Sequence, residues 1–124
     1  MRFLILVTAA VMIATLLGAQ APGPVSKAGS APAGNAQNGK TLYVSYGCYE
    51  CHDREGQGGA GTGPRLAPKP IPFVAFSAYT RHPSGQMPPY TAKVVSDKDL
   101  ADIYAFLRSI PQPPPVKSIP LLNN

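Results

Sequence analysis

The sequence has only two cysteines in 124 residues, Cys48 and Cys51. It also lacks internal repeats, a glycine-rich loop after a strand, a phosphate-binding loop and a credible Ser/His/Asp set, which argues against a nucleotide-binding protein or a serine hydrolase. Segments with the alternation of apolar and polar residues that marks paired strands are missing as well. These absences favour an all-α protein whose function depends on the two cysteines.

Both ends of the chain have compositions that do not suit a folded domain. Residues 1–21 combine a positive start, a short apolar run and small residues, which predicts a secretory signal peptide; an uncleaved membrane anchor is the alternative. Residues 22–35 are rich in Ala, Pro, Gly and Ser, and predict a flexible leader. Residues 111–124 are proline-rich and predict an extended tail. With either interpretation of the start, we expect the folded part to be exported to the periplasm.

Residues 36–110 remain for the folded domain, and a domain this small usually needs a disulfide, a metal or a bound group for stability. Asn35 is a candidate N-cap for a helix over about residues 36–46. A second helix follows the N-cap Ser96, has acidic residues in its first turn and a broad apolar face, and ends before Pro111. We therefore expect one helix near each end of this domain.

Two stretches lie between these helices. Residues 56–72 are dense in glycine and proline, and predict a loop. Residues 73–79 could form a short helix or a strand, and the helix is favoured because the chain offers no partner strand. The prediction is an all-α fold with long loops.

Residues 47–53, GCYECHD, are the most informative stretch of the sequence. A structural zinc site needs four ligands, usually in two close pairs. Here the cysteine pair and His52 leave the second pair missing, with only His82 as a further candidate, so a zinc site is disfavoured. A thioredoxin-like dithiol would need strands around it, and a disulfide between Cys48 and Cys51 would close almost no loop. The pattern C-x-x-C-H is typical of covalent haem c, in which both thiols form thioethers with the haem and the adjacent histidine becomes the proximal iron ligand. The sequence therefore predicts one covalently bound haem c with its iron.

A haem iron that transfers electrons has a second axial ligand, and Met87 is the candidate. It is the one methionine left once residues 1–21 are removed, and it lies in the proline-containing stretch GQMPPY rather than in a periodic apolar segment where methionine fills a core. We predict a low-spin iron ligated by His52 and Met87. His82 is the alternative sixth ligand, which would give a bis-histidine centre of lower potential.

This region resembles the class I, mono-haem c-type cytochromes of the compact bacterial type. The resemblance extends over residues 38–110 and implies a class I cytochrome c fold, in which small helices and long loops surround one covalently bound haem. The motifs that carry it are Gly39-Lys40-Thr41-Leu42-Tyr43, Cys48-Tyr49-Glu50-Cys51-His52, Gly63-Pro64-Arg65-Leu66, Met87-Pro88 and the helical stretch 100–107.

The resemblance also implies two contacts. The Pro64 carbonyl is expected to accept a hydrogen bond from the imidazole of His52, which would fix the ring and make it a more basic ligand. Phe106 is expected to pack against Gly39 and Tyr43, where the first and last helices cross.

The charge of the chain bears on its partners. The sequence has 11 basic and 6 acidic side chains, and without Arg2 the net charge is 10 − 6 = +4. Arg65 and Arg81 are candidates to bind the haem propionates, since a planar guanidinium suits a carboxylate; ordinary surface arginines are the alternative. The basic residues are scattered and lack the interleaved aromatics of a single-strand platform, so we expect no nucleic-acid partner.

These features together predict an electron carrier and not an enzyme: a periplasmic cytochrome, monomeric, that shuttles one electron between redox proteins. A haem c subunit of a periplasmic dehydrogenase or oxidase complex is the alternative, which the proline-rich tail leaves open. A ligand-binding haem sensor or haem enzyme is a third possibility, but no distal acid or base is evident. We expect membrane contact only if the N-terminal segment is uncleaved.

Overall fold

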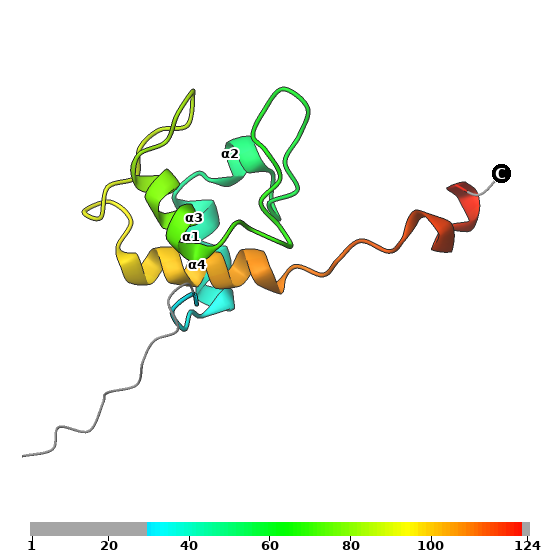
Figure 1. Ribbon diagram of the computed structural model, residues 1–124, viewed down its shortest axis with the longest axis horizontal. Coiled ribbons are helices and arrows are strands. Elements are labelled where there is room, and N and C mark those ends of the chain that lie inside the picture. The colour runs from blue at the N-terminus through cyan, green and yellow to red at the C-terminus, as the bar shows by residue number, and fades with distance from the viewer. Residues whose placement is uncertain (1–29, 123–124) are drawn as a thin grey trace, which may run out of the picture.

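The structure is a computed structural model that describes residues 30–122, so the predicted signal peptide and most of the predicted leader lie outside the described residues. The described part is helical, without strands, which confirms the all-α prediction (Figure 1). None of its helices is long and apolar enough to cross a membrane. Its elements are α1 (Ala36–Ser45), α2 (Tyr49–His52), α3 (Phe73–Arg81), α4 (Asp97–Ser109) and two 3₁₀ turns, η1 (Val116–Ser118) and η2 (Pro120–Leu122).

Local capping signals set the starts of the two main helices. The Asn35 side chain accepts a hydrogen bond of 3.0 Å from the Asn38 amide at the start of α1. The Ser96 hydroxyl accepts one of 3.1 Å from the Asp99 amide at the start of α4, where Asp97 and Asp99 also favour the helix dipole. Both predicted N-caps are therefore confirmed.

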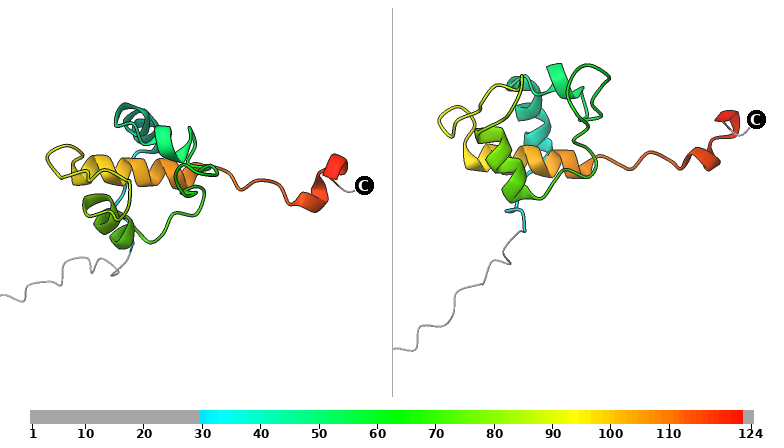
Figure 2. Two further views of the ribbon diagram at one scale, coloured as in Figure 1. Left: turned by 90° about the horizontal axis from the view of Figure 1, so that it is seen from above. Right: turned by 45° about the horizontal axis from the view of Figure 1, so that its top comes forward.

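Helix α4 lies between α1 and α3 (Figure 2). On one side it crosses α1 at Gly39, which is buried, and a Cβ added there would overlap the backbone of Asp102. Next to this crossing the rings of Tyr43 and Phe106 pack with their centroids 5.4 Å apart. The predicted contact between these two rings is thus confirmed. Gly39 was predicted to face Phe106 as well, but the atoms nearest to a Cβ added at Gly39 belong to the backbone of Asp102 and Ile103.

Helix α3 packs on the other side of α4 through aromatic residues. Phe73 and Phe76 lie with their ring centroids 5.2 Å and 5.3 Å from that of Tyr104, which is buried. The weakly favoured short helix over residues 73–79 is confirmed and extends to Arg81. The core formed along α4 is small: Tyr43, Ala67, Phe76, Val95, Leu100, Ile103, Tyr104, Phe106 and Leu107.

Helix α2 and two loops, residues 53–72 and 82–95, rise on the same side of α4 (Figure 1). The first loop is closed by backbone hydrogen bonds from Leu66 and Ala67 to the Gly56 carbonyl, at 2.8 Å and 2.9 Å. Residues 111–122 instead run away from the helices in every view (Figures 1 and 2). The predicted loop corresponds to what the structure has, whereas only the first part of the tail is extended, because residues 116–122 form the 3₁₀ turns η1 and η2.

Candidate functional site

Helix α2 is a single turn that presents the C-x-x-C-H motif. Gly47 has a positive φ of 75° and reverses the chain after α1, and Asp53, with a φ of 63°, ends the turn. The His52 amide donates to the Cys48 carbonyl at 3.1 Å. Since Cys48 and Cys51 are three positions apart in helical backbone, their sulfurs lie on one face of the turn.

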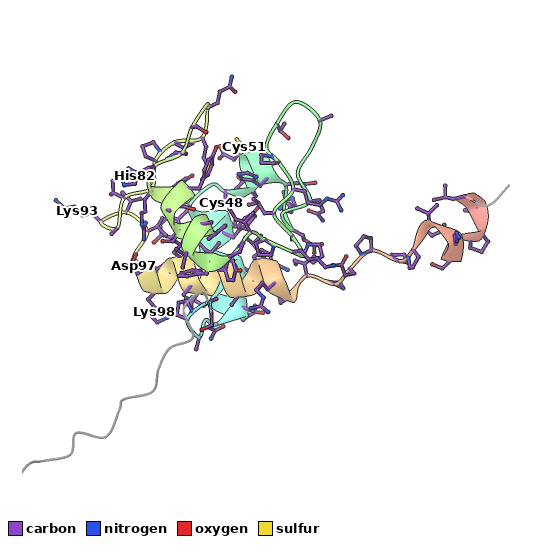
Figure 3. The ribbon with its side chains drawn as sticks, viewed as in Figure 1. Cys48, Cys51, His82, Lys93, Asp97 and Lys98 are labelled. Atoms are coloured by element: carbon purple, nitrogen blue, oxygen red, sulfur yellow. The ribbon has the colours of Figure 1, made fainter. Side chains whose placement is uncertain are left out.

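The two cysteines have different surroundings. Cys48 is half-buried toward the helices, whereas Cys51 is exposed on α2 (Figure 3). Burial raises the pKa of the Cys48 thiol to about 11. A redox dithiol needs a lowered thiol pKa to supply its thiolate, so this environment argues against the thioredoxin-like alternative.

His52 is buried, at 8 % exposure, and is held by the first loop. Its Nδ1 lies 2.8 Å from the carbonyl oxygen of Pro64, the contact that the resemblance implied. Because a carbonyl can only accept, Nδ1 carries the hydrogen, and the lone pair is on Nε2. A ring that is fixed at Nδ1 and basic at Nε2 is the usual form of a metal-ligating histidine.

Gly63 allows the loop to lie directly against this ring. Its amide donates to the Cys51 carbonyl at 2.7 Å, and a Cβ on Gly63 would come within 2.7 Å of Nδ1 of His52. Sequence reasoning included Gly63 in a motif but gave it no role of its own. The signal that could have found the role is its position just before the proline whose carbonyl faces the histidine.

Met87 is half-buried in the second loop, between α3 and α4. The loop returns to α3 at Tyr90, whose amide donates to the Thr80 carbonyl at 3.0 Å. The Tyr90 hydroxyl donates to the Tyr46 carbonyl at 3.0 Å, two residues before Cys48. The structure thus ties the Met87 loop to the segment that carries the cysteines.

Burial raises the pKa of Tyr90, with smaller contributions from Cys48, Cys51 and Glu50. The Tyr90 hydroxyl therefore lies in the electrostatic environment of the motif. Sequence reasoning did not single out Tyr90. His82 is exposed at the outer end of α3, where it is the C-cap residue (Figure 3).

The two candidate propionate ligands differ in what surrounds them. Arg65 is exposed beside Pro64. Arg81 is bound to protein acceptors: its guanidinium donates to the carbonyls of Tyr90 and Val95 and to the carboxylate of Asp97, each at 2.7 Å. Arg81 is therefore bound to the loop that follows α3 and to the start of α4, whereas Arg65 is exposed.

The donor set on this side of the molecule fits covalent haem c. Two thiols lie on one face of a helical turn, followed by a buried imidazole whose Nε2 is available, and a thioether lies in a loop tied to the same segment. In residues 30–122 no three His, Cys, Asp or Glu side chains gather as a metal site would need, so the zinc alternative lacks ligands there.

Comparison with known proteins adds one match. A family model described as cytochrome c oxidase, cbb3-type, subunit III, matches residues 34–107. The matched span begins before α1, includes Cys48, Cys51, His52 and Met87, and ends within α4. No curated protein and no solved structure matches the chain.

Proposed function

Because the chain belongs to the family of the cbb3-type cytochrome c oxidase subunit III, a family of haem c domains that carry electrons, we propose that it is a periplasmic one-electron carrier ligated by His52 and Met87. Its fold is that of a c-type cytochrome, its cofactor is covalent haem c, and it acts as an electron carrier and not as a catalyst. When bound, the haem supplies an iron that alternates between the ferric and ferrous states. The remaining chemistry belongs to the side chains that hold the group.

In this proposal the thiols of Cys48 and Cys51 would hold the haem through two thioethers, and Nε2 of His52 and the sulfur of Met87 would bind its iron. The Pro64 carbonyl holds the imidazole through Nδ1, which keeps the ring in one tautomer and one orientation. With His52 and Met87 both bound to the iron, no position would remain open for a substrate. That arrangement suits electron transfer and not ligand binding.

The observation that carries the proposal is the hydrogen bond of 2.8 Å between Nδ1 of His52 and the Pro64 carbonyl. A buried histidine that served only the core could donate through either nitrogen. Here the histidine directly follows Cys51 in the same helical turn, and its Nε2 is left free to bind a metal. This combination supports iron ligation more than a structural role.

The proposal is tested with the Met87→Ala and His82→Ala variants of the haem-loaded protein. The long-wavelength absorption band that marks a sulfur ligand on ferric haem c should disappear in the Met87 variant and persist in the His82 variant. The ferrous Met87 variant should also bind carbon monoxide rapidly, while the wild type and the His82 variant bind it slowly. Rapid carbon monoxide binding by the wild type, without a sulfur band, would favour a ligand-binding sensor or enzyme instead.

A second candidate function, a subunit docked in a dehydrogenase or oxidase complex, is supported by the tail. Four of the residues 111–115 are prolines, and the residues after them include exposed apolar side chains: Val116 at 63 %, Leu121 at 85 % and Leu122 at 60 %. A stiff proline segment that leaves the domain and carries exposed apolar residues suits attachment to another protein better than free diffusion.

Truncation after Ile110 separates the two functions. On a native gel of cell extract stained for haem, a docked subunit should run in a high-mass band that loses its haem stain in the truncated strain. A free carrier should run as a small protein with or without the tail. Fractionation of the same cells tests the periplasmic location, and the mass of the purified chain tests cleavage near residue 21.

A further inference from the structure

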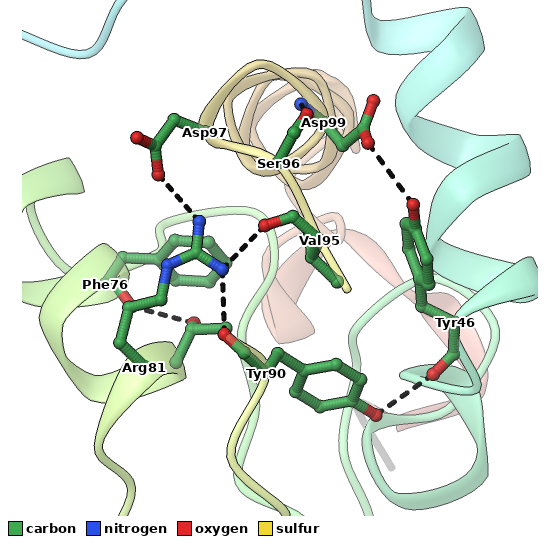
Figure 4. Close-up of polar contacts among 9 residues, drawn as sticks. Tyr46, Phe76, Arg81, Tyr90, Val95, Ser96, Asp97 and Asp99 are labelled. Carbon is green, nitrogen blue, oxygen red and sulfur yellow. Dashed lines mark hydrogen bonds and ion pairs between the residues drawn. The ribbon is translucent and has the colours of Figure 1, made fainter. Parts of the chain in front are cut away.

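Arg81, in the last turn of α3, has a set of contacts that electron transfer as described above does not use. Its Nη1 donates to the carbonyl oxygens of Tyr90 and Val95, both at 2.7 Å, and its Nη2 donates to Oδ1 of Asp97 at 2.7 Å (Figure 4). One side chain therefore joins the end of α3, both ends of the segment 90–95 and the first residue of α4.

The two carbonyl contacts matter more than the ion pair. The Arg81 side chain is only 14 % exposed, and Val95 is 2 % exposed, so these hydrogen bonds are largely shielded from water. The Asp97 side chain is 84 % exposed, and an exposed ion pair contributes little. The guanidinium thus acts mainly as a donor to buried backbone.

These contacts close the base of the loop that contains Met87. The chain leaves α3 after Arg81 and returns at Tyr90, whose amide donates to the Thr80 carbonyl at 3.0 Å. Met87 lies between these two points. On the side away from Arg81, the Tyr90 hydroxyl donates to the Tyr46 carbonyl, and the Tyr46 hydroxyl lies 3.2 Å from Asp99 (Figure 4). Tyr90 is therefore held at both its backbone and its ring.

We propose that Arg81 is the positioning residue of the axial-ligand loop: its hydrogen bonds to Tyr90 and Val95 hold the loop closed, so that Met87 stays in place. This inference rests on the proposed ligation by Met87. It gives Arg81 a role other than propionate binding, because three of its five N–H groups already donate to the protein. Lysine cannot replace arginine here, since an ammonium lacks the planar fork that reaches three acceptors at fixed angles.

The test uses the haem-loaded full chain with substitutions at three positions. Arg81→Lys removes the fork and keeps the charge, and Arg81→Gln serves as a second variant if the lysine variant does not yield folded protein. Asp97→Asn removes the exposed ion pair and one negative charge at the start of α4, and leaves both carbonyl contacts of Arg81 in place. Asp102→Asn, at the distant contact between α1 and α4, lowers global stability without touching the loop, and so serves as the matched control.

Three readouts are compared: the sulfur-ligand band of the ferric protein, the rate of carbon monoxide binding to the ferrous protein, and amide hydrogen exchange at Tyr90 and Val95. Losing hydrogen bonds from a charged donor shifts a closed–open equilibrium by roughly tenfold or more. We expect carbon monoxide binding to accelerate by about that factor in the Arg81 variant, with a weaker band and faster exchange at both amides. The Asp97 and Asp102 variants should stay within about twofold of the wild type.

Three results would overturn the inference. The first is an Arg81 variant with the band and the binding rate of the wild type. The second is an Asp102 variant that has the same thermal stability as the Arg81 variant and binds carbon monoxide equally fast. The third is a changed band with unchanged amide exchange, since Arg81 would then act on the haem directly. Failure of the Met87 proposal is recognised separately, because the Met87→Ala variant would then keep the sulfur-ligand band. Amide exchange at Tyr90 in the Arg81 variant would still report whether Arg81 holds the loop closed.

Discussion

Removal of the Asp102 carboxylate should destabilise the domain more than its place in the middle of a helix suggests. The side chain is 2 % exposed and accepts three hydrogen bonds: from the Asn35 amide at 2.7 Å, from Nδ2 of Asn38 at 2.8 Å and from Nζ of Lys98 at 2.8 Å. The first two donors belong to the start of α1. The carboxylate therefore joins the two helices whose crossing forms the core.

The magnitude follows from these three bonds. Hydrogen bonds to a charged acceptor contribute about 1.5–3 kcal/mol each, but the exposed donors of Lys98 and Asn38 regain water when the carboxylate is lost. The net cost of Asp102→Ala should therefore be about 2–4 kcal/mol. In a domain of this size that lowers the melting temperature by roughly 10–25 °C. Asp102→Asn, which keeps the shape and one acceptor, should cost about half as much.

The pH dependence gives the sharper test. The hydrogen bond from Lys98, followed by those from Asn35 and Asn38, lowers the pKa of Asp102 from 3.8 to about 2. Because the folded state holds this proton more weakly than the unfolded state, the stabilisation is complete above pH 4 and is lost as the pH falls toward 2. The difference in melting temperature between wild type and Asp102→Asn should then shrink between pH 4 and pH 2. It is measured by circular dichroism of the haem-loaded proteins, and a difference that stays constant over this range would refute the reasoning.

Two further substitutions test the helix crossing and the histidine support. Gly39→Ala should force α1 away from α4 and lower the free energy of unfolding by about 1–3 kcal/mol or more. Lys40→Ala, at the neighbouring position, should leave the stability unchanged. Equal thermal stability of the two variants would argue against the close crossing. Gly63→Ala should displace the ring of His52, because the new methyl group would lie 2.7 Å from Nδ1, and should reduce covalent haem on a stained gel. Thr62→Ala is its control, and normal haem content in the glycine variant would contradict the geometry.

The helices could be predicted because their signals are local. The caps at Asn35 and Ser96 act on amides three residues away, and the end of α4 is set by the proline at 111. Helix α3 extends two residues beyond the predicted stretch 73–79. In its last turn the Arg81 guanidinium donates to the carbonyls of Tyr90 and Val95, and residue patterns do not indicate such side-chain contacts.

The part of the candidate site that lies close together in the sequence was also predictable, because its signal is local. Two thiols and an imidazole within one helical turn form a contiguous pattern, and the contact between His52 and Pro64 came from a family resemblance. The role of Arg81 was not predictable, because its acceptors at Tyr90 and Val95 are backbone carbonyls. Any residue supplies a carbonyl, so the sequence contains no sign of which one a guanidinium will find.

Tyr43 shows that the core and the site are not independent. Its ring is fully buried beside Phe106 in the crossing of α1 and α4, and its hydroxyl donates to the Asp53 carbonyl at 2.9 Å. Asp53 is the residue that ends α2, directly after His52. A shift of α1 against α4 is therefore transmitted through one rigid side chain to the backbone that orients the imidazole. In a domain with so small a core, the contacts that stabilise the fold are also those that position the proposed iron ligand, His52.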